Sequence, residues 1–301
     1  MIHNYDRDTM RLSSWQNSSG RVPHRQASNR KYGDRNAILP VLLMIAFHRC
    51  LWTIALLLII SPGTSMAENA TPRFKLVVLA EAGGIRRPFV DAAKVWLDKQ
   101  AAGNTFSVEC IQDSAKIDGA FLSRYQVFIQ RNYPAYGWTP TAMAAFTKCI
   151  IEEGRGGWIG FHHATLLGEF AGYPMWPWFS PFMGGIRFID YIPKFATATV
   201  VVEDPLHPVM KDAGKTFAVD QEKRYAYDKS PRPNVHVLAR VNQATYSPDT
   251  RTKMGDHLVV WTTEHYKARN SHIFMRYHTE LFHNPAFTTI FRNSILGAAR
   301  P

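Results

Sequence analysis

The chain has 301 residues, of which 46% are hydrophobic, 13% aromatic and 20% charged. This composition excludes a disordered chain and a fibrous protein, and the length suits one large domain or two small ones. The net charge of +11 invites a nucleic-acid partner, but eight of the 35 basic and three of the 24 acidic residues lie in residues 1–67. The rest carries 27 basic and 21 acidic residues, a net +6, with no recognisable nucleic-acid module. We therefore expect no nucleic-acid partner.

The amino-terminal part of the chain has the pattern of a secretory signal peptide. A short basic segment, Met44–Arg49, precedes the apolar run Cys50–Ile60, and Ser61-Pro62-Gly63 then breaks the run. Small residues at Ser65 and Ala67 form a cleavage signal. This order predicts a signal peptide at residues 44–67 that is cleaved after Ala67.

The predicted signal peptide divides the chain into a segment before it and a domain after it. Residues 1–43 are polar over most of their length, so we expect them to be disordered or to precede the true start of translation. Residues 68–301 are then a single exported domain, periplasmic or secreted. The alternative is an uncleaved anchor at residues 38–60, which would be the protein's sole link to a membrane.

Strands and helices are predicted to alternate after residue 73. Residues 74–80 are a near-continuous apolar run, typical of a strand buried on both faces, and a helix is predicted at residues 88–100. Further strands are predicted at residues 105–111, 125–130, 157–161, 197–202, 235–239, 257–262 and 271–276, and further helices at 140–153 and 285–299. Residues 173–182 are too irregular for a regular element. The alternation predicts an α/β fold with a doubly wound, mostly parallel sheet flanked by helices.

Two cysteines remain after the predicted leader, Cys110 in a predicted strand and Cys149 in a predicted helix. An exported protein permits a disulfide between them, but two cysteines do not make a disulfide scaffold. Two free thiols are favoured over a pair.

The strongest local feature is a pair of histidines, His162 and His163, at the carboxyl end of the predicted strand 157–161. Open sheets of this class bind ligands at that edge. Neighbouring residues of a strand point to opposite faces, so both rings face one pocket only if the backbone turns there. Neither Cys nor Ser stands at this corner, which disfavours a covalent acyl intermediate and the glutamine amidotransferase reaction.

Several motifs occur in a specific order along the chain. They are the Gly-Gly-x-x-Gly-x-His corner at 156–163, Trp176 followed by Gly184-Gly185 and Phe188, Asp204–Val209, Asp220–Tyr225, Val235–Ala239, Trp261, Lys267-x-Arg269 leading to His278, Asn284–Phe287 and Ile295–Ala298. Together they resemble the ThuA-like (trehalose utilisation) family over most of residues 74–298. The resemblance implies a flavodoxin-like, class I glutamine amidotransferase-like fold that lacks the nucleophile.

The resemblance also implies a site and a substrate class. It implies acid–base residues at His162, Glu222 and His278, to which we add His163 from its place at the same strand end, and a small-molecule carbohydrate as substrate. Two imidazoles and a carboxylate can share proton transfer near neutral pH, or can bind a divalent metal through His162, Glu222 and His278. Both alternatives stay open. The reaction is then the hydrolysis or elimination of a glycoside or keto-glycoside, with Arg87, Trp176, Asp190 and Tyr225 expected to contact the sugar.

Two departures from the family pattern support a different class of function. The family usually carries a histidine after the first strand and another after the Gly-Gly-x-x-Phe motif, where this chain has Arg87 and Asp190. An arginine at the first position favours an anionic or strongly hydrogen-bonding ligand. The alternative is therefore a non-catalytic sugar-binding or accessory protein on the same fold.

Overall fold

A computed structural model of the chain describes residues 71–80, 87–131, 137–166, 178–192, 194–275 and 278–299. The predicted signal peptide, the segment before it, the alternative anchor and Trp176 lie outside the described residues. Within the described ranges, no helix combines the length and the apolar character needed to span a membrane.

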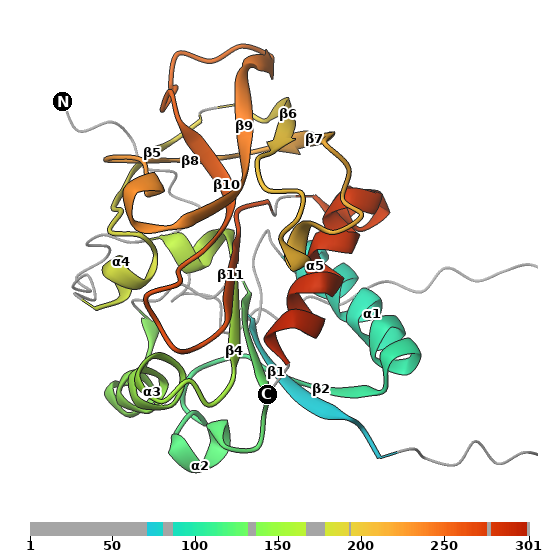
Figure 1. Ribbon diagram of the computed structural model, residues 1–301, viewed down its shortest axis with the longest axis vertical. Helices are drawn as coiled ribbons and strands as arrows, with labels where there is room; N and C mark the ends of the chain where they lie inside the picture. Colours follow the sequence, from blue (N-terminus) through green and yellow to red (C-terminus); the bar gives the residue numbers. More distant parts are fainter. Residues whose placement is uncertain are drawn as a thin grey trace, which may run out of the picture. The chain divides into compact units, whose positions relative to one another are not determined.

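A mixed sheet, parallel on one side and antiparallel on the other, organises the chain (Figure 1). Nine strands lie in the order β2-β1-β3-β4-β11-β10-β9-β6-β7. The first five are parallel to one another, and the other four continue the sheet in antiparallel fashion. Strands β5 and β8 form a separate antiparallel pair. The strands are β1 (Phe74–Ala80), β2 (Phe106–Ile111), β3 (Val127–Arg131), β4 (Gly157–Phe161), β5 (Phe188–Tyr191), β6 (Ala196–Val202), β7 (Thr216–Glu222), β8 (Tyr225–Tyr227), β9 (His236–Ser247), β10 (His257–Thr262) and β11 (Asn270–Ile273).

Helices cover both faces of the parallel strands. One core cluster joins β1, β3 and β4 to α1 and α5, and the other joins the opposite face of these strands to α2 and α3. Figure 1 shows α1 and α5 on the right and α2 and α3 at the lower left. The helices are α1 (Arg87–Asn104), α2 (Gly119–Leu122), α3 (Pro140–Phe146), α4 (Phe179–Phe182) and α5 (Pro285–Ala298). This arrangement confirms the predicted doubly wound α/β fold.

The helix starts follow from local sequence chemistry. Thr139 and Asn284 accept hydrogen bonds from the first backbone amides of α3 and α5, and each is followed by a proline, which fits the first turn of a helix. In α1, buried Phe89, Ala93 and Leu97 recur every fourth residue and pack on the sheet.

Several elements differ from the predictions. The predicted helix 140–153 is α-helical only to Phe146 and continues as a π-helical turn, Thr147–Glu152. The predicted strand 235–239 extends through β9 to Ser247, because buried side chains continue along its pairing with β6. Part of the predicted irregular loop forms the short helix α4. The prediction omitted α2, β5, β7 and β8. Cys110 and Cys149 are both free thiols.

Two glycines of β4 permit close packing around the strand. A Cβ atom at Gly157 would overlap Ala298 at the end of α5, and one at Gly160 would overlap the indole ring of Trp158. The glycines at this corner therefore serve packing, and the buried Trp158 fills the space that Gly160 leaves.

We expect Gly160→Ala to lower the free energy of unfolding by about 1–3 kcal/mol, because the added methyl group must displace a fully buried indole. Urea unfolding measures the change. Gly103→Ala is the matched control, since a methyl group there meets nothing within 4 Å and lies in α1. The control should be neutral or more stable by up to about 1 kcal/mol. Equal stabilities of Gly160→Ala and the native protein would contradict this packing role.

Candidate active site

The backbone turns sharply where β4 ends. Phe161 is extended, but His162 has a φ of +24°, and residues 162–165 form a 3₁₀ turn. A positive φ is unfavourable for a histidine and is retained where the surrounding structure enforces it, often at functional sites. This turn meets the condition under which two successive histidines can face the same space.

Tyr225 of β8 is the common contact of both histidine rings. Its ring centroid lies 4.1 Å from that of His162, edge to face, and 6.1 Å from that of His163, nearly parallel. The two imidazole centroids are 5.7 Å apart. Both histidines are almost fully buried. The tertiary structure therefore gathers two imidazoles and a phenol at the carboxyl end of β4.

A hydroxyl pair holds the turn in place. Thr165 Oγ1 donates to the carbonyl oxygen of His162 at 2.5 Å and lies 2.7 Å from Tyr227 Oη. Because the threonine hydroxyl has a single proton, Tyr227 is the donor of the second bond. Burial raises the pKa of Tyr227, which keeps this donor protonated. β8 thus positions the histidines through Tyr225 and Tyr227 together.

Glu222 ends β7 and joins the cluster from the antiparallel part of the sheet. Its Oε1 lies 3.6 Å from His162 Nδ1, within ion-pair distance but beyond a normal hydrogen bond. The residue is 0% exposed. A carboxylate without contact to water needs compensating charge nearby.

Arg224 supplies a buried positive charge two residues further on. It is 1% exposed, and its Nη1 donates to the carbonyl oxygen of Ala196 at 3.1 Å. Burial lowers the pKa of Arg224, and the charge of Glu222 opposes that effect. Glu222 and Arg224 are therefore a coupled pair of buried charges beside His162.

His257 is a buried, neutral histidine that stabilises the strand carrying Tyr225. His257 Nδ1 lies 2.9 Å from Tyr246 Oη and 3.1 Å from Gln243 Nε2. Burial lowers the pKa of His257 to about 3, the nearby Arg224 adds to this, and a hydrogen bond to the main chain of Tyr225 acts in the opposite direction. In the neutral form Nδ1 accepts, so Nε2–H donates to Tyr225. This hydrogen bond holds in place β8, the strand that carries Tyr225.

Two buried histidines predict an acid-sensitive fold. Burial lowers the pKa of His272 to about 3, as it does for His257, against an ordinary value of 6.5. As the pH falls, these two histidines take up protons in the unfolded chain near pH 6.5 but in the folded protein only near pH 3. Their contribution to the free energy of unfolding is therefore complete above about pH 6.5 and declines as the pH falls toward 3. His272 packs between aromatic rings, with Trp158 and Trp261 centroids at 4.8 and 5.3 Å. His272→Phe should therefore flatten the pH dependence of urea unfolding.

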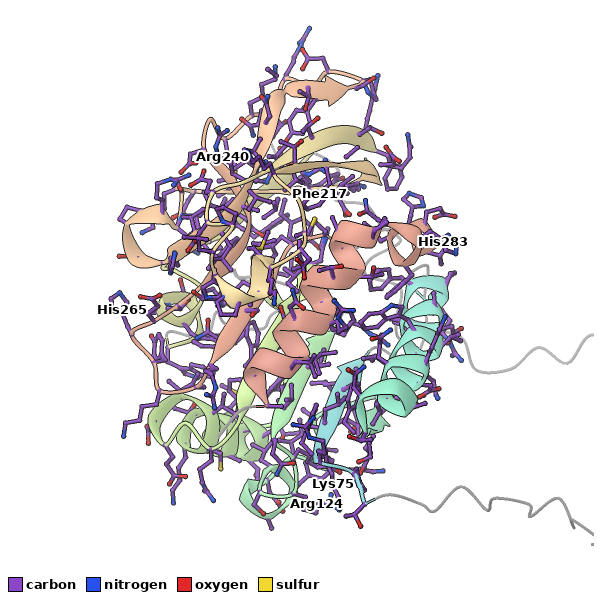
Figure 2. All side chains as sticks on the ribbon, turned by 45° about the vertical axis from the view of Figure 1, so that its right-hand side comes forward. Lys75, Arg124, Phe217, Arg240, His265 and His283 are labelled. Carbon is purple, nitrogen blue, oxygen red and sulfur yellow. The ribbon has the colours of Figure 1, made fainter. Side chains whose placement is uncertain are left out.

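The control for this prediction is His265→Asn, at an exposed position on the loop between β10 and β11, which Figure 2 labels. It should leave the pH dependence unchanged. An unchanged slope in His272→Phe between about pH 6.5 and pH 4 would contradict the role given to His272.

The other predicted site residues occupy different surroundings. His278 precedes the 3₁₀ turn Thr279–His283, with its ring 5.3 Å from Phe195 and its Nδ1 3.8 Å from Glu280 Oε2. Arg87 begins α1 with a half-exposed side chain that binds both carboxylate oxygens of Asp91. Asp190 is exposed on β5, where it accepts from its neighbour's amide. Trp176 lies outside the described residues.

The described residues contain no set of side chains arranged as the ligands of a metal ion. No group of three or more His, Cys, Asp or Glu residues within them is placed to hold one ion. His162, Glu222 and His278 thus do not meet the arrangement that the alternative requires, and we derive no step through a metal.

Arg131 is a further charged residue that the sequence analysis did not single out. It ends β3 beside β4, is 1% exposed and donates through Nη2 to the carbonyl oxygen of Val90 at 2.9 Å. Its Nε and Nη1 have no hydrogen-bond partner among the described residues. Burial lowers its pKa to about 10, so it stays charged at neutral pH. Like Arg224, it is indistinguishable from a surface arginine in the sequence.

Comparison with known proteins gives consistent matches. The sequence matches the model of the ThuA family, described as trehalose utilisation, over residues 75–297. A ThuA-like protein from Bacteroides uniformis is 27% identical, with a TM-score of 0.65 and coverage of 75% of this chain and 91% of its own. One from Parabacteroides merdae is 18% identical, with a TM-score of 0.54 and coverage of 76% and 90%, a similarity of fold alone. No curated protein matches the chain.

Proposed function

Because the chain belongs to the ThuA family, we propose that it acts on a carbohydrate, a glycoside or its keto derivative, by acid–base chemistry at the carboxyl end of β4. The observation that carries this proposal is the convergence of His162 and His163 on Tyr225, with Glu222 3.6 Å from His162. A strand-end position in an open α/β sheet is where such folds bind ligands.

The arrangement supports a division of roles. Glu222 lies within 3.6 Å of His162, so the pair can take a proton from the sugar and pass it between carboxylate and imidazole. His163 or His278 then protonates the departing oxygen, as hydrolysis and elimination both require. Tyr225 offers an aromatic face, and Arg87, Asp190 and Trp176 remain proposed sugar contacts.

The test is a product assay on a panel of glycosides and keto-glycosides with the full chain. We expect turnover of at least one member, and a loss of about 10²- to 10⁴-fold in His162→Asn and His163→Asn, which remove proton transfer but keep side-chain size. His265→Asn is the matched control and should keep full activity. Native activity in the double variant His162→Asn/His163→Asn would overturn the proposal.

One observation favours the alternative of a non-catalytic sugar-binding protein. Arg87, where the family has a histidine, is engaged with Asp91 of its own helix. Such a protein would bind a panel sugar with unchanged affinity in His162→Asn and His163→Asn and would yield no product. Calorimetric titration beside the product assay separates the two functions.

We also propose that the domain is exported after cleavage behind Ala67. The pattern of residues 44–67 supports this proposal. Amino-terminal sequencing of the exported protein should begin at Glu68. A protein that retains residues 38–60 would instead support the membrane-anchored alternative.

A further inference from the structure

A cavity lies away from the histidine cluster, among residues that the proposed active site does not use. It has a volume of about 390 Å³ and is bounded by the loop between β10 and β11, the carboxyl-terminal part of α5 and the turn Pro208–Met210. The loop ends where β11 begins, whereas His162 follows the end of β4, and the two strands are parallel. The cavity therefore lies at the opposite edge of the sheet from the proposed active site. Figure 2 labels His265 on this loop.

Two buried hydroxyl groups line this cavity without a partner. Thr262 is 8% exposed and Ser294 is 1% exposed, and neither hydroxyl has a hydrogen-bond partner among the described residues. A serine inside a helix commonly bonds to a carbonyl of the preceding turn, which Ser294 does not do. Buried polar groups are rarely left unsatisfied, and those that are need an explanation.

Asn270 and Thr263, polar residues next to this cavity, have hydrogen-bond partners. The unpaired hydroxyls of Thr262 and Ser294 therefore do not reflect poor packing of the whole loop. Asn270 accepts from the amide of Thr263 and donates to the carbonyl oxygens of Thr263 and Ala268. Thr263 Oγ1 donates to the carbonyl oxygen of Phe182 at 2.9 Å. The loop is thus held by its own side chains, while Thr262 and Ser294 face the cavity that it helps to form.

The remaining polar lining consists largely of hydrogen-bond donors. His207 Nδ1 accepts from the amide of Val209, and burial, followed by the nearby His236, lowers the pKa of His207. The neutral ring then carries its proton on Nε2 as a donor. Lys267 and Arg269 add two cations. Glu264, the one carboxylate among the described residues of the lining, lies 2.7 Å from His236 Nδ1, and its hydrogen bond raises the pKa of His236.

We propose that this cavity binds a small molecule that carries an oxyanion, either a phosphate ester or a carboxylate. Hydroxyl, imidazole, ammonium and guanidinium donors around one space match the acceptor oxygens of such a group. A volume of about 390 Å³ holds more than an inorganic ion and falls in the usual range of small-molecule sites. The proposal does not depend on the chemistry assigned to His162 and Glu222.

The test is calorimetric titration of the full chain, with thermal unfolding in parallel, using glucose 6-phosphate, glucuronate, glucose and inorganic phosphate as probes. We expect saturable binding of glucose 6-phosphate or glucuronate at micromolar to millimolar concentration, weaker binding of inorganic phosphate and none of glucose. The tighter of the first two probes identifies the oxyanion as phosphate or carboxylate.

Two substitutions separate a ligand role from a structural one. Thr262→Val and Ser294→Ala should each weaken binding of the tighter probe about tenfold or more, because each removes a hydrogen bond to a charged group. Without probe, each variant should keep or raise its melting temperature, since it removes an unsatisfied buried hydroxyl. Thr216→Val, at an exposed position of β7, is the matched control and should bind as the native protein does.

Three results would overturn the proposal: no saturable binding of either anionic sugar, equal binding of glucose, or native affinity in the double variant Thr262→Val/Ser294→Ala. A lower melting temperature of both single variants without probe would assign the hydroxyls a structural role instead. His162→Asn should bind these probes normally, so failure here is distinguishable from failure of the proposed function.

Discussion

Glu222→Gln is expected to lower kcat about 10²- to 10⁴-fold on any sugar that the protein converts, with a much smaller change in KM. Glutamine keeps the size and most contacts of a side chain that is 0% exposed, but it cannot accept a proton from the substrate or from His162. Steady-state kinetics on the best substrate of the product assay measures both constants. The loss should fall mainly on kcat because proton transfer occurs in the transition state.

Asp220→Asn is the matched control for this substitution. Asp220 stands two residues earlier on the same strand and is exposed, so its amide variant should keep native kcat and KM. A folded Glu222→Gln protein with native kcat would remove Glu222 from the proposed chemistry. Circular dichroism and thermal unfolding establish that the variant is folded.

Arg224→Met is expected to reduce the free energy of unfolding by about 3–5 kcal/mol, because it leaves the buried carboxylate of Glu222 without its nearby cation. The variant also loses the hydrogen bond to the carbonyl oxygen of Ala196. Urea unfolding near pH 7 measures the change. Arg87→Met is the contrasting control, since that half-exposed arginine pairs with Asp91 at the surface and should contribute less than about 1 kcal/mol.

The combination Glu222→Gln/Arg224→Met tests whether the two charges act together. Removing both leaves no uncompensated buried charge, so the double variant should be more stable than the sum of the single effects predicts. Strict additivity would show that Arg224 stabilises the fold independently of Glu222. The same double variant also separates catalysis from folding, because it should be inactive even if it regains stability.

The local pattern of hydrophobic residues was sufficient to predict the strands of the parallel half of the sheet and the helices that pack on them. The apolar runs at β1 and β4 and the periodic apolar faces of α1 and α5 are visible in the sequence, because burial on a sheet or under a helix imposes a period on hydrophobic residues. The antiparallel additions were less visible. β7 has only two buried residues out of seven, and β8 has three residues, so each owes its extended form to a partner strand.

The site shows the same division. The position of His162 and His163 at a strand end, and the condition that the backbone must turn there, follow from the alternation of side chains along a strand. That the turn occurs depends on contacts that Thr165 and Tyr227 make across 62 residues of sequence. The sequence does not reveal that Arg224 and His257 are buried, because an ionisable residue is written the same way whether the fold buries it or exposes it.

The amino-acid order thus determined the elements of the parallel half, the fold class and the edge of the sheet where chemistry is expected, since these depend on local periodicity and on the way parallel strands align. Tertiary structure alone decided that Tyr225 reaches both histidines and Glu222 reaches His162, that Arg224 is buried beside Glu222, and that Thr262 and Ser294 face a cavity at the other edge. The distances between these side chains and their burial arise from contacts between segments that are remote in sequence, and no local pattern encodes them.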